Sequence, residues 1–302
     1  MKAGTQSLTP AAACIEKGRV AVICELFKLR LTLLVLLTTL VGFYIASTGG
    51  IDYVLMAHTL IGTSLLACGA AALNQLWERE YDAKMRRTQD RPLPSGRMQT
   101  DTVLVLGGLL SIAGLIYSAI FVNVLASFLG GLTLATYLFL YTPLKRVTWL
   151  NTAVGAIPGA LPPLIGWTAA RNELSNEAIA LFAILFFWQI PHFLAIAWIY
   201  RDEYAKAGFV MLPNVDPHGF RTSRQAVSHT FGLVLVSLWP VVFGLTGIMY
   251  LAGAFVLGAI FLVTALRFSR RLTLPSARQL FFASILYLPL LLGLMVLDKI
   301  RS

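Results

Sequence analysis

Residues 53–73 read YVLMAHTLIGTSLLACGAAAL, and residues 74–92 read NQLWEREYDAKMRRTQDRP. The first run is apolar over about 20 residues, the length that a helix needs to cross a bilayer. The second run turns polar at once and carries Asn74, Glu78 and Asp82 at intervals of four. On a helix, positions spaced in this way drift by only about 40° per step and share one face. We therefore expect a membrane helix that ends in a row of oxygen ligands.

The composition of the whole chain is typical of a polytopic membrane protein. Of its 302 residues, 57% are hydrophobic and 13% are charged, and the mean hydropathy is +0.75. A soluble protein carries roughly twice that share of charge. We expect an all-α bundle of nine transmembrane helices. They are predicted at about 31–48, 53–73, 102–121, 123–141, 151–170, 178–199, 227–247, 249–266 and 279–297.

The distribution of positive charge predicts the orientation of the bundle. With nine spans, 21 of the 24 Lys and Arg residues fall on the side of the N-terminal segment, and only Arg171, Lys299 and Arg301 fall on the other. Cytoplasmic loops are enriched in Lys and Arg. The N-terminus and the loops at 74–101 and 200–226 are therefore expected in the cytoplasm. The net charge of +10 then reflects orientation and contact with anionic lipid or substrate, so nucleic acid is not expected as a partner.

Two regions are expected along the chain. Residues 1–28 are mixed and polar, and we interpret them as a cytoplasmic N-terminal segment. Residues 29–302 form a single intramembrane domain, with its active site on the cytoplasmic side because nearly all polar chemistry lies in the inward loops.

The row of oxygen ligands suits magnesium. Asn74, Glu78 and Asp82 span about 12 Å along a helix, a length that allows one or two Mg²⁺ ions to bridge a diphosphate. Mg²⁺ usually takes one or two carboxylates together with phosphate oxygens. The alternative is a solvated helix end in which Glu78 pairs with Arg79 or Arg86.

Basic residues follow directly. Arg87, Thr88 and Arg91 lie in a loop closed by Pro92 and Gly96. Guanidinium groups bind diphosphate oxygens bidentately and stabilise the charge on a leaving diphosphate. Any one of these arginines could instead serve only as a positive anchor on the cytoplasmic side.

Four motifs in order carry a resemblance to a known family. The pattern Asn-x3-Glu-x2-Tyr-Asp-x2-Met-x-Arg-Thr-x2-Arg-x4-Gly, from Asn74 to Gly96, resembles the signature of the UbiA-type intramembrane prenyltransferases. Within that family, the part Asp-x2-Met-x-Arg-Thr-x2-Arg-Pro, from Asp82 to Pro92, is similar to the protohaem IX farnesyltransferases (haem O synthases). Three further segments are similar to the same proteins: YTPLKR at 141–146, WQIPHF at 188–193 and YRDEYAKAGFVMLP at 200–213. The likeness covers most of residues 25–298.

The resemblance implies an activity: Mg²⁺-dependent transfer of a farnesyl group from farnesyl diphosphate to the vinyl group of haem b, giving haem O. It also implies a multi-pass protein of the bacterial inner (cytoplasmic) membrane. The expected metal ligands are Asn74, Glu78, Asp82 and Asp202. The expected catalytic residues are Asp82, Arg87, Arg91 and Lys206, and the expected substrate-binding residues are Asn74, Thr88, Lys145, Arg146, His192 and Tyr204.

This chain departs from the family pattern at its second acidic motif. Many relatives have two acids four residues apart, whereas here Asp202 is followed at that spacing by Lys206. Lys206 could therefore hold the diphosphate directly. Lys145 and Arg146 could bind the diphosphate or haem propionates, or act only as anchors.

His192 follows Pro191 inside the sixth expected span, about 10 Å from its cytoplasmic end. It could ligate the haem iron or hydrogen-bond a propionate. The alternative is a histidine satisfied by a neighbouring helix.

Two other functions stay open at this point. One is prenyl transfer to an aromatic quinone precursor. The segment around His192, and the lysine at position 206 in the second acidic motif, favour haem over such an acceptor. The other is an ion-coupled transporter, although its acids would then cluster at one membrane face only. A haem-handling or oxidase protein downstream is a further expected partner of a haem O synthase.

Overall fold

The computed structural model describes residues 18–300, and this part of the chain is helical almost throughout. Nine segments in it are long and apolar enough to cross a membrane, as the hydropathy predicts. The spans are α2 (Leu29–Ala46), α3 (Tyr53–Asp82), α4 (Thr100–Phe121), α5 (Val124–Ala135) with the π-helix η1 (Thr136–Tyr141) and α6 (Thr142–Leu144), α7 (Asn151–Ala160) with α8 (Pro162–Arg171), α9 (Asn176–Ile199), α12 (Phe220–Val236) with α13 (Trp239–Val242), α14 (Ile248–Arg271) and α15 (Leu274–Leu297). The short helices are α1 (Arg19–Leu26), α10 (Arg201–Ala207) and α11 (Leu212–Val215).

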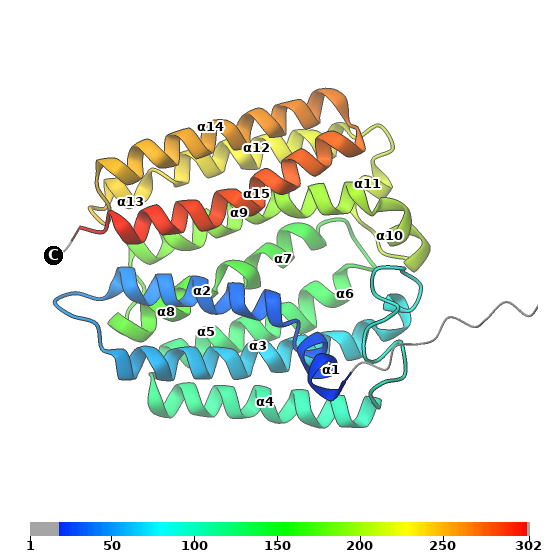
Figure 1. The fold of residues 1–302 in the computed structure, drawn as a ribbon, viewed down its shortest axis with the longest axis horizontal. Helices are drawn as coiled ribbons and strands as arrows, with labels where there is room; N and C mark the ends of the chain where they lie inside the picture. The colour runs from blue at the N-terminus through cyan, green and yellow to red at the C-terminus, as the bar shows by residue number, and fades with distance from the viewer. Residues whose placement is uncertain (1–17, 301–302) are drawn as a thin grey trace, which may run out of the picture.

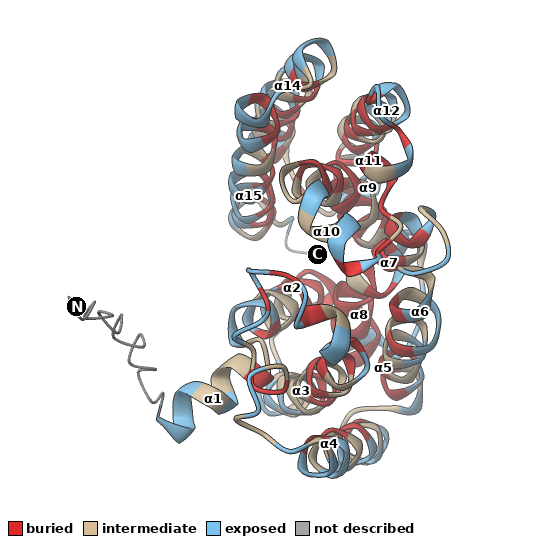
Figure 2. Cartoon of the chain, turned by 90° about the vertical axis from the view of Figure 1, so that its right-hand side faces the viewer, coloured by how far each residue is buried: buried red, intermediate tan, exposed pale blue. Residues whose placement is uncertain are grey.

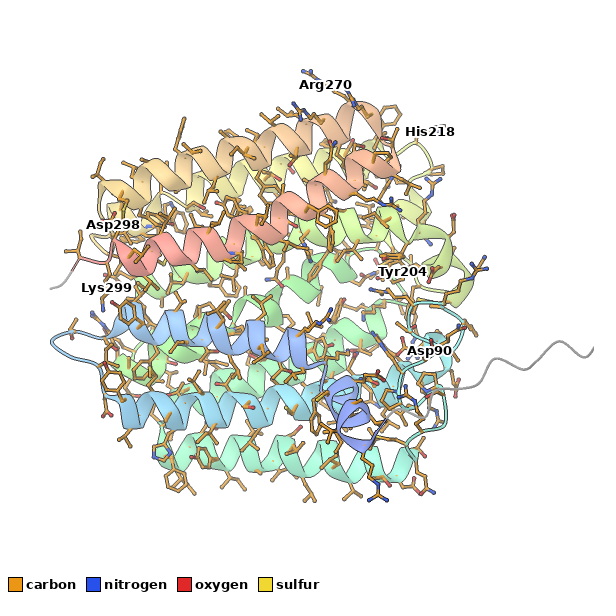
Figure 3. All side chains as sticks on the ribbon, in the orientation of Figure 1. Asp90, Tyr204, His218, Arg270, Asp298 and Lys299 are labelled. Atoms are coloured by element: carbon orange, nitrogen blue, oxygen red, sulfur yellow. The ribbon has the colours of Figure 1, made fainter. Side chains whose placement is uncertain are left out.

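The spans run side by side, and the short helices gather at one end of the bundle (Figure 1). We call this the loop end, defined by α1, α10, α11 and residues 83–99. Asp90, Tyr204 and His218 lie at the loop end, whereas Asp298 and Lys299 lie at the opposite end (Figure 3). Viewed from the loop end, the buried residues face the interior of the bundle, and the exposed ones face outwards (Figure 2). Residues 1–17, which make up most of the expected N-terminal segment 1–28, lie outside the described residues.

Helix α3 is longer than its apolar run. Its 30 residues continue without a break from Tyr53 to Asp82, which makes it about 45 Å long. Asn74, Glu78 and Asp82 are all buried, and the expectation that they share one helical face is confirmed. The helix thus extends nine residues beyond the apolar run predicted at about 53–73, and these three polar residues on the extension are buried.

Two spans are irregular where they line the interior. In the fourth span, the chain widens into η1 between Thr136 and Tyr141; π-turns of this kind are often found at functional sites. The fifth span is divided at Leu161 into α7 and α8, directly before Pro162 and Pro163. A proline removes a backbone donor and clashes with the preceding turn. The two prolines therefore account for the break in the fifth span.

The close packing of α2 on α8 depends on two glycines. A Cβ added to Gly42 would overlap the backbone of Pro163, and one added to Gly166 would overlap the backbone carbonyl of Thr39. Small residues at such positions let membrane helices approach closely. Because the atoms in the way belong to the backbone, neither helix can make room by rotating a side chain.

We predict that Gly42→Ala lowers the stability of the protein by about 1–3 kcal/mol, the usual range for overpacking. The matched control is Gly108→Ala on α4, where an added Cβ would meet nothing within 4 Å. There the better helix propensity of alanine should leave stability unchanged or raised. The measurement is the thermal unfolding of both variants in the same detergent. Equal melting temperatures would contradict the packing role of Gly42.

Candidate active site

A cavity of about 470 Å³ begins among charged side chains near the loop end and continues between the helices into an apolar interior. Its charged part contains Lys28, Arg87, Arg91 and Lys145 together with two acids, Glu78 and Asp82. Its apolar walls include Val35, Leu66, Ala70, Leu134, Ile165 and Leu185. A cavity of this kind can hold a molecule with an anionic head and an apolar tail.

An ion pair between Glu78 and Lys145 lies at the charged end of the cavity. Lys145 Nζ is 2.7 Å from Glu78 Oε1, and the two side chains are only 13% and 5% exposed. The ammonium group also lies 4.3 Å from the ring centre of Tyr141. Burial by itself would lower the pKa of Lys145, but Glu78 outweighs it, and the pKa lies above its ordinary value. Lys145 is therefore positively charged in this site.

Asp82 lies one helical turn further along α3. Its Oδ2 accepts a hydrogen bond of 2.6 Å from Arg91 Nη1, and its backbone carbonyl accepts one of 2.9 Å from the buried Thr88 hydroxyl. The other carboxylate oxygen, Oδ1, is buried and has no hydrogen-bond partner among residues 18–300. A buried acceptor without a donor is costly in a folded protein, which indicates that a group bound in the cavity completes its environment.

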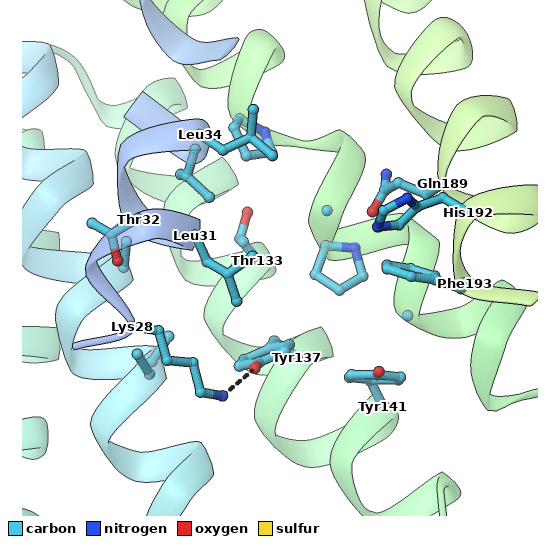
Figure 4. A pocket seen from close by; sticks show the side chains of 18 of the residues that line it. Lys28, Leu31, Thr32, Leu34, Thr133, Tyr137, Tyr141, Gln189, His192 and Phe193 are labelled. Atoms are coloured by element: carbon cyan, nitrogen blue, oxygen red, sulfur yellow. Dashed lines mark hydrogen bonds between the residues drawn. The ribbon is translucent and has the colours of Figure 1, made fainter. Parts of the chain in front are cut away.

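Lys28 is a cavity residue that the sequence did not single out. It precedes α2 in a left-handed conformation with φ of 48°, and its Nζ donates to Asn74 Oδ1 and, over 3.4 Å, to the Tyr137 hydroxyl (Figure 4). Burial, followed by the charges of Arg91 and Lys145, lowers its pKa to about 7. An anion entering the cavity would raise this pKa again. In the sequence, Lys28 is one of several basic residues before a membrane helix. Nothing in the sequence pattern therefore distinguishes it as a cavity residue.

Lys28 also bears on the expected boundary between residues 1–28 and the membrane domain. Gln75 Nε2 donates to the backbone carbonyls of Glu25 and Leu26 at 2.8 Å each, which ties α1 to α3. The end of the predicted N-terminal segment thus contributes a side chain to the cavity. The boundary itself stays a prediction.

Arg87 connects residues 83–99 to α10 at the rim of the cavity. Its Nη2 donates to the Tyr204 hydroxyl over 3.0 Å, and its guanidinium lies 5.1 Å from the ring centre of Tyr200. Both Arg87 and Tyr204 line the cavity. The first and the last of the sequence motifs therefore meet here, as expected for two loops on the same side of the bundle.

Asp202 and Lys206 are not brought into the cavity. The Asp202 side chain is 88% exposed and lies 3.7 Å from Arg201, and Lys206 is exposed as well. The reason is helical geometry: both are two residues from Tyr204, so they project from roughly the opposite side of α10. Their assignment as a metal ligand and a diphosphate ligand stays a prediction that this geometry does not support.

Three more predicted residues lie outside the cavity lining. Arg146 donates to the Trp77 carbonyl over 2.9 Å, and its guanidinium stacks on Tyr81 beside a separate surface cavity. Because Arg146 directly follows Lys145 on a helical turn, its side chain projects about 100° away from that of Lys145. Asn74 is buried between Lys28 and Thr142, to which its Nδ2 donates over 3.1 Å. Thr88 bonds the backbone of Asp82, so Asn74 and Thr88 position the groups that face the cavity.

His192 lines the cavity on α9, on the side opposite Lys28 and next to Gln189 and Phe193 (Figure 4). Its Nδ1 is 2.7 Å from the Ser284 hydroxyl of α15. The substrate role of His192 stays a prediction. A neighbouring helix does supply a hydrogen bond, and the ring still faces the space where a substrate can bind.

The donor set fits a magnesium ion. Among residues 18–300 no three His, Cys, Asp or Glu side chains cluster as a closed metal site. Mg²⁺ does not require one, since it commonly takes one or two carboxylates plus water and substrate phosphates. Glu78 and the free Oδ1 of Asp82 provide two carboxylates in the cavity, and the surrounding cations suit the phosphate oxygens.

Charged groups at one end of a cavity with apolar walls, inside a bundle of membrane helices, suit an enzyme embedded in the bilayer. Residues 35–286 match the model of the UbiA prenyltransferase family, and the chain belongs to that family.

Two relatives are similar over about nine-tenths of this chain. A protohaem IX farnesyltransferase of Solibacter usitatus is 49% identical over 91% of this chain and 97% of the relative. A mitochondrial protohaem IX farnesyltransferase of Arabidopsis thaliana is 38% identical over 92% of this chain and 65% of the relative.

Solved structures show the same fold at low identity. A digeranylgeranylglyceryl phosphate synthase superimposes with a TM-score of 0.79 at 16% identity, over 92% of this chain and 98% of the other. A UbiA homologue of Archaeoglobus fulgidus bound to DMAPP and Mg²⁺ superimposes with a TM-score of 0.63 at 15% identity, over 90% of this chain and 98% of the other.

We predict that Lys145→Met destabilises the protein by about 3–5 kcal/mol, because it leaves Glu78 as an unpaired buried charge. Combining Lys145→Met with Glu78→Gln should recover most of this loss, since no charge is then left alone. Thermal unfolding of the two single variants and the double variant in one detergent measures the coupling. A double variant that is no more stable than Lys145→Met would contradict the pairing.

Proposed function

We propose that this chain is a protohaem IX farnesyltransferase: it transfers the farnesyl group of farnesyl diphosphate to a vinyl group of haem b and forms haem O. The observation that carries the proposal is the cavity, with Lys28, Arg91 and Lys145 around two carboxylates at its charged end and apolar walls beyond. The names of the relatives support the acceptor and the prenyl group. The Archaeoglobus fulgidus homologue bound to GPP and Mg²⁺ supports a prenyl diphosphate with magnesium.

The roles of the residues follow from their places in the cavity. Glu78 and Asp82 would hold Mg²⁺, which supplies positive charge to the diphosphate oxygens. Lys28, Arg91 and Lys145 neutralise the same oxygens, and Arg87 covers them from the rim. Such fixed charges stabilise the diphosphate as the bond between its oxygen and the first farnesyl carbon breaks, which is where negative charge develops.

The apolar part of the cavity protects the other product of that cleavage. The diphosphate leaves with the bonding electron pair, so the farnesyl group becomes an allylic cation that water would quench. Apolar walls exclude water until the π electrons of a vinyl group form the new carbon–carbon bond. Water then adds to the cation left on the former vinyl group and releases a proton, which gives the hydroxyl group of haem O. No side chain has to deprotonate the nucleophile.

The positive residues support an orientation with the loop end in the cytoplasm. The loop end contains 83–99 and α10, which belong to the basic segments of the sequence, and Lys and Arg favour the cytoplasmic side. We propose a protein of the bacterial inner membrane with its N-terminus in the cytoplasm. Farnesyl diphosphate, which is anionic, would then reach the charged end of the cavity from water. A haem-handling or oxidase protein as recipient of the product stays a prediction.

We predict that the purified protein forms a farnesylated haem from haem b, farnesyl diphosphate and Mg²⁺, as detected by mass spectrometry, and that chelating Mg²⁺ stops the reaction. Asp82→Asn should lower kcat by about 100-fold or more. Replacing a residue that only supports a metal ligand already lowers metal affinity or activity by about 10–100-fold, and Asp82 is expected to bind the metal itself. Glu80→Gln is the matched control, because Glu80 lies two residues earlier on α3 and is 75% exposed.

Two results would overturn the proposal. Turnover of an aromatic quinone precursor, without any product from haem b, would move the protein to the other acceptor class. Cation transport by reconstituted protein without prenyl transfer would make it a transporter.

We predict that Lys28→Met raises the KM for farnesyl diphosphate by about tenfold, which corresponds to the loss of about 1.4 kcal/mol of binding. Lys28→Arg should keep most of the affinity because it keeps the charge. Lys84→Met is the control, since Lys84 is exposed outside the cavity. Steady-state kinetics at saturating haem b measure the effect, and an unchanged KM in Lys28→Met would remove Lys28 from the diphosphate site.

A further inference from the structure

Two aromatic rings, those of Trp188 and Phe281, stack on His192. The ring centres of Trp188 and Phe281 each lie 5.1 Å from that of His192, with interplanar angles of 20° and 26°. Trp188 is fixed in turn, because its Nε1 donates to the Ser284 carbonyl over 2.8 Å. The orientation of the imidazole is therefore set jointly by α9 and α15.

The hydroxyl of Ser284 determines which nitrogen of His192 carries the proton. Ser284 Oγ lies 2.6 Å from the Phe281 carbonyl, which can only accept, so the single hydroxyl proton of Ser284 is donated there. Ser284 Oγ then has only lone pairs to offer to His192 Nδ1, 2.7 Å away. Nδ1 must be the donor in that bond. In the neutral ring, Nε2 consequently has no proton and presents a lone pair.

This lone pair has no protein partner in the described part of the chain. No hydrogen bond to His192 Nε2 is found among residues 18–300, and the ring lines the cavity. An imidazole whose Nδ1–H is fixed by an outer acceptor is the form in which histidine ligates metals. Mg²⁺ is a poor candidate, because it prefers oxygen ligands. An ionised propionate is excluded as well, because it only accepts hydrogen bonds.

We propose that His192 Nε2 is the axial ligand of the iron of the acceptor haem, and that Ser284 is a positioning residue that sets its tautomer and orientation. This inference rests on the proposed function, which places haem b in the cavity. Imidazole is a common ligand of haem iron. The bond uses the lone pair of Nε2, and no proton or electron is transferred. Ligation from a rigid ring would fix the porphyrin against the cavity, so that one vinyl group is presented to the farnesyl carbon.

The test is to titrate the purified full chain with haem b and to record its absorption, EPR and resonance Raman spectra. Wild-type protein should show histidine ligation, and His192→Gly should lose this signature and regain it when imidazole is added. His58→Gly is a matched control: the Nδ1 of His58 also bonds a hydroxyl, that of Tyr117 at 2.7 Å, and its ring stacks on Phe121, but it does not line the cavity. Its haem spectrum should match that of the wild type.

Ser284→Ala tests the positioning role and does not depend on the folding of His192→Gly. Loss of the acceptor for Nδ1–H should weaken haem binding by about 10–100-fold and shift the Fe–His stretching band of the ferrous protein. A band at the wild-type position with unchanged affinity would overturn the role of Ser284. A histidine-ligated spectrum that persists in His192→Gly without imidazole would overturn the axial ligand.

These outcomes are separable from failure of the proposed function. Farnesylated haem made by wild-type protein, with identical haem spectra for wild type and His192→Gly, leaves the function standing and removes the ligand. A spectrum that depends on His192, without any farnesylated product, does the reverse.

Discussion

The ion pair between Glu78 and Lys145 is the interaction on which the site depends. A charge inside a bundle of membrane helices is costly unless an opposite charge meets it with good geometry. Here the two groups are 67 residues apart in the sequence, and their charged atoms lie 2.7 Å from each other. The pair allows α3 to continue as a helix past its apolar run and to bring Asp82 into the interior. Because Lys28 and Arg91 lie around the same two acids, the cavity has more cations than carboxylates, and the excess favours a polyanion.

The irregular helices give this charged site its apolar extension. The π-turn of η1 places Tyr137 and Tyr141 on the cavity wall, and the division between α7 and α8 adds Pro158 and Pro162. Backbone that departs from a regular helix is tolerated at membrane depth where it is buried or lines a cavity. Gly42 and Gly166 also hold α2 in close contact with α8, and both helices contribute residues to the cavity wall. A rigid apolar space beside fixed charges is what ionisation without premature hydrolysis requires.

Much of the fold could be predicted, and the site could be predicted in part. The nine spans follow from hydropathy, and the common face of Asn74, Glu78 and Asp82 follows from their spacing on α3. The spacing of Asp202 and Lys206 correctly predicts that they share one face of a helix. It does not predict the rotation of α10, which directs Tyr204 into the cavity and the other two side chains into solvent. Lys28 was overlooked because, in sequence, a cavity lysine and an anchoring lysine before a membrane helix are the same pattern.

The sequence by itself determined the helices, their number and the family, because the cost of placing a side chain in a bilayer is largely local to each segment. Tertiary structure alone decided the partners: Lys145 for Glu78, Arg91 for Asp82, and Asn74 for Lys28. It also decided that Ser284, 92 residues from His192, fixes the proton of that ring. Such contacts depend on how each helix is rotated against its neighbours. Packing over the whole bundle sets that rotation, and no single segment encodes it.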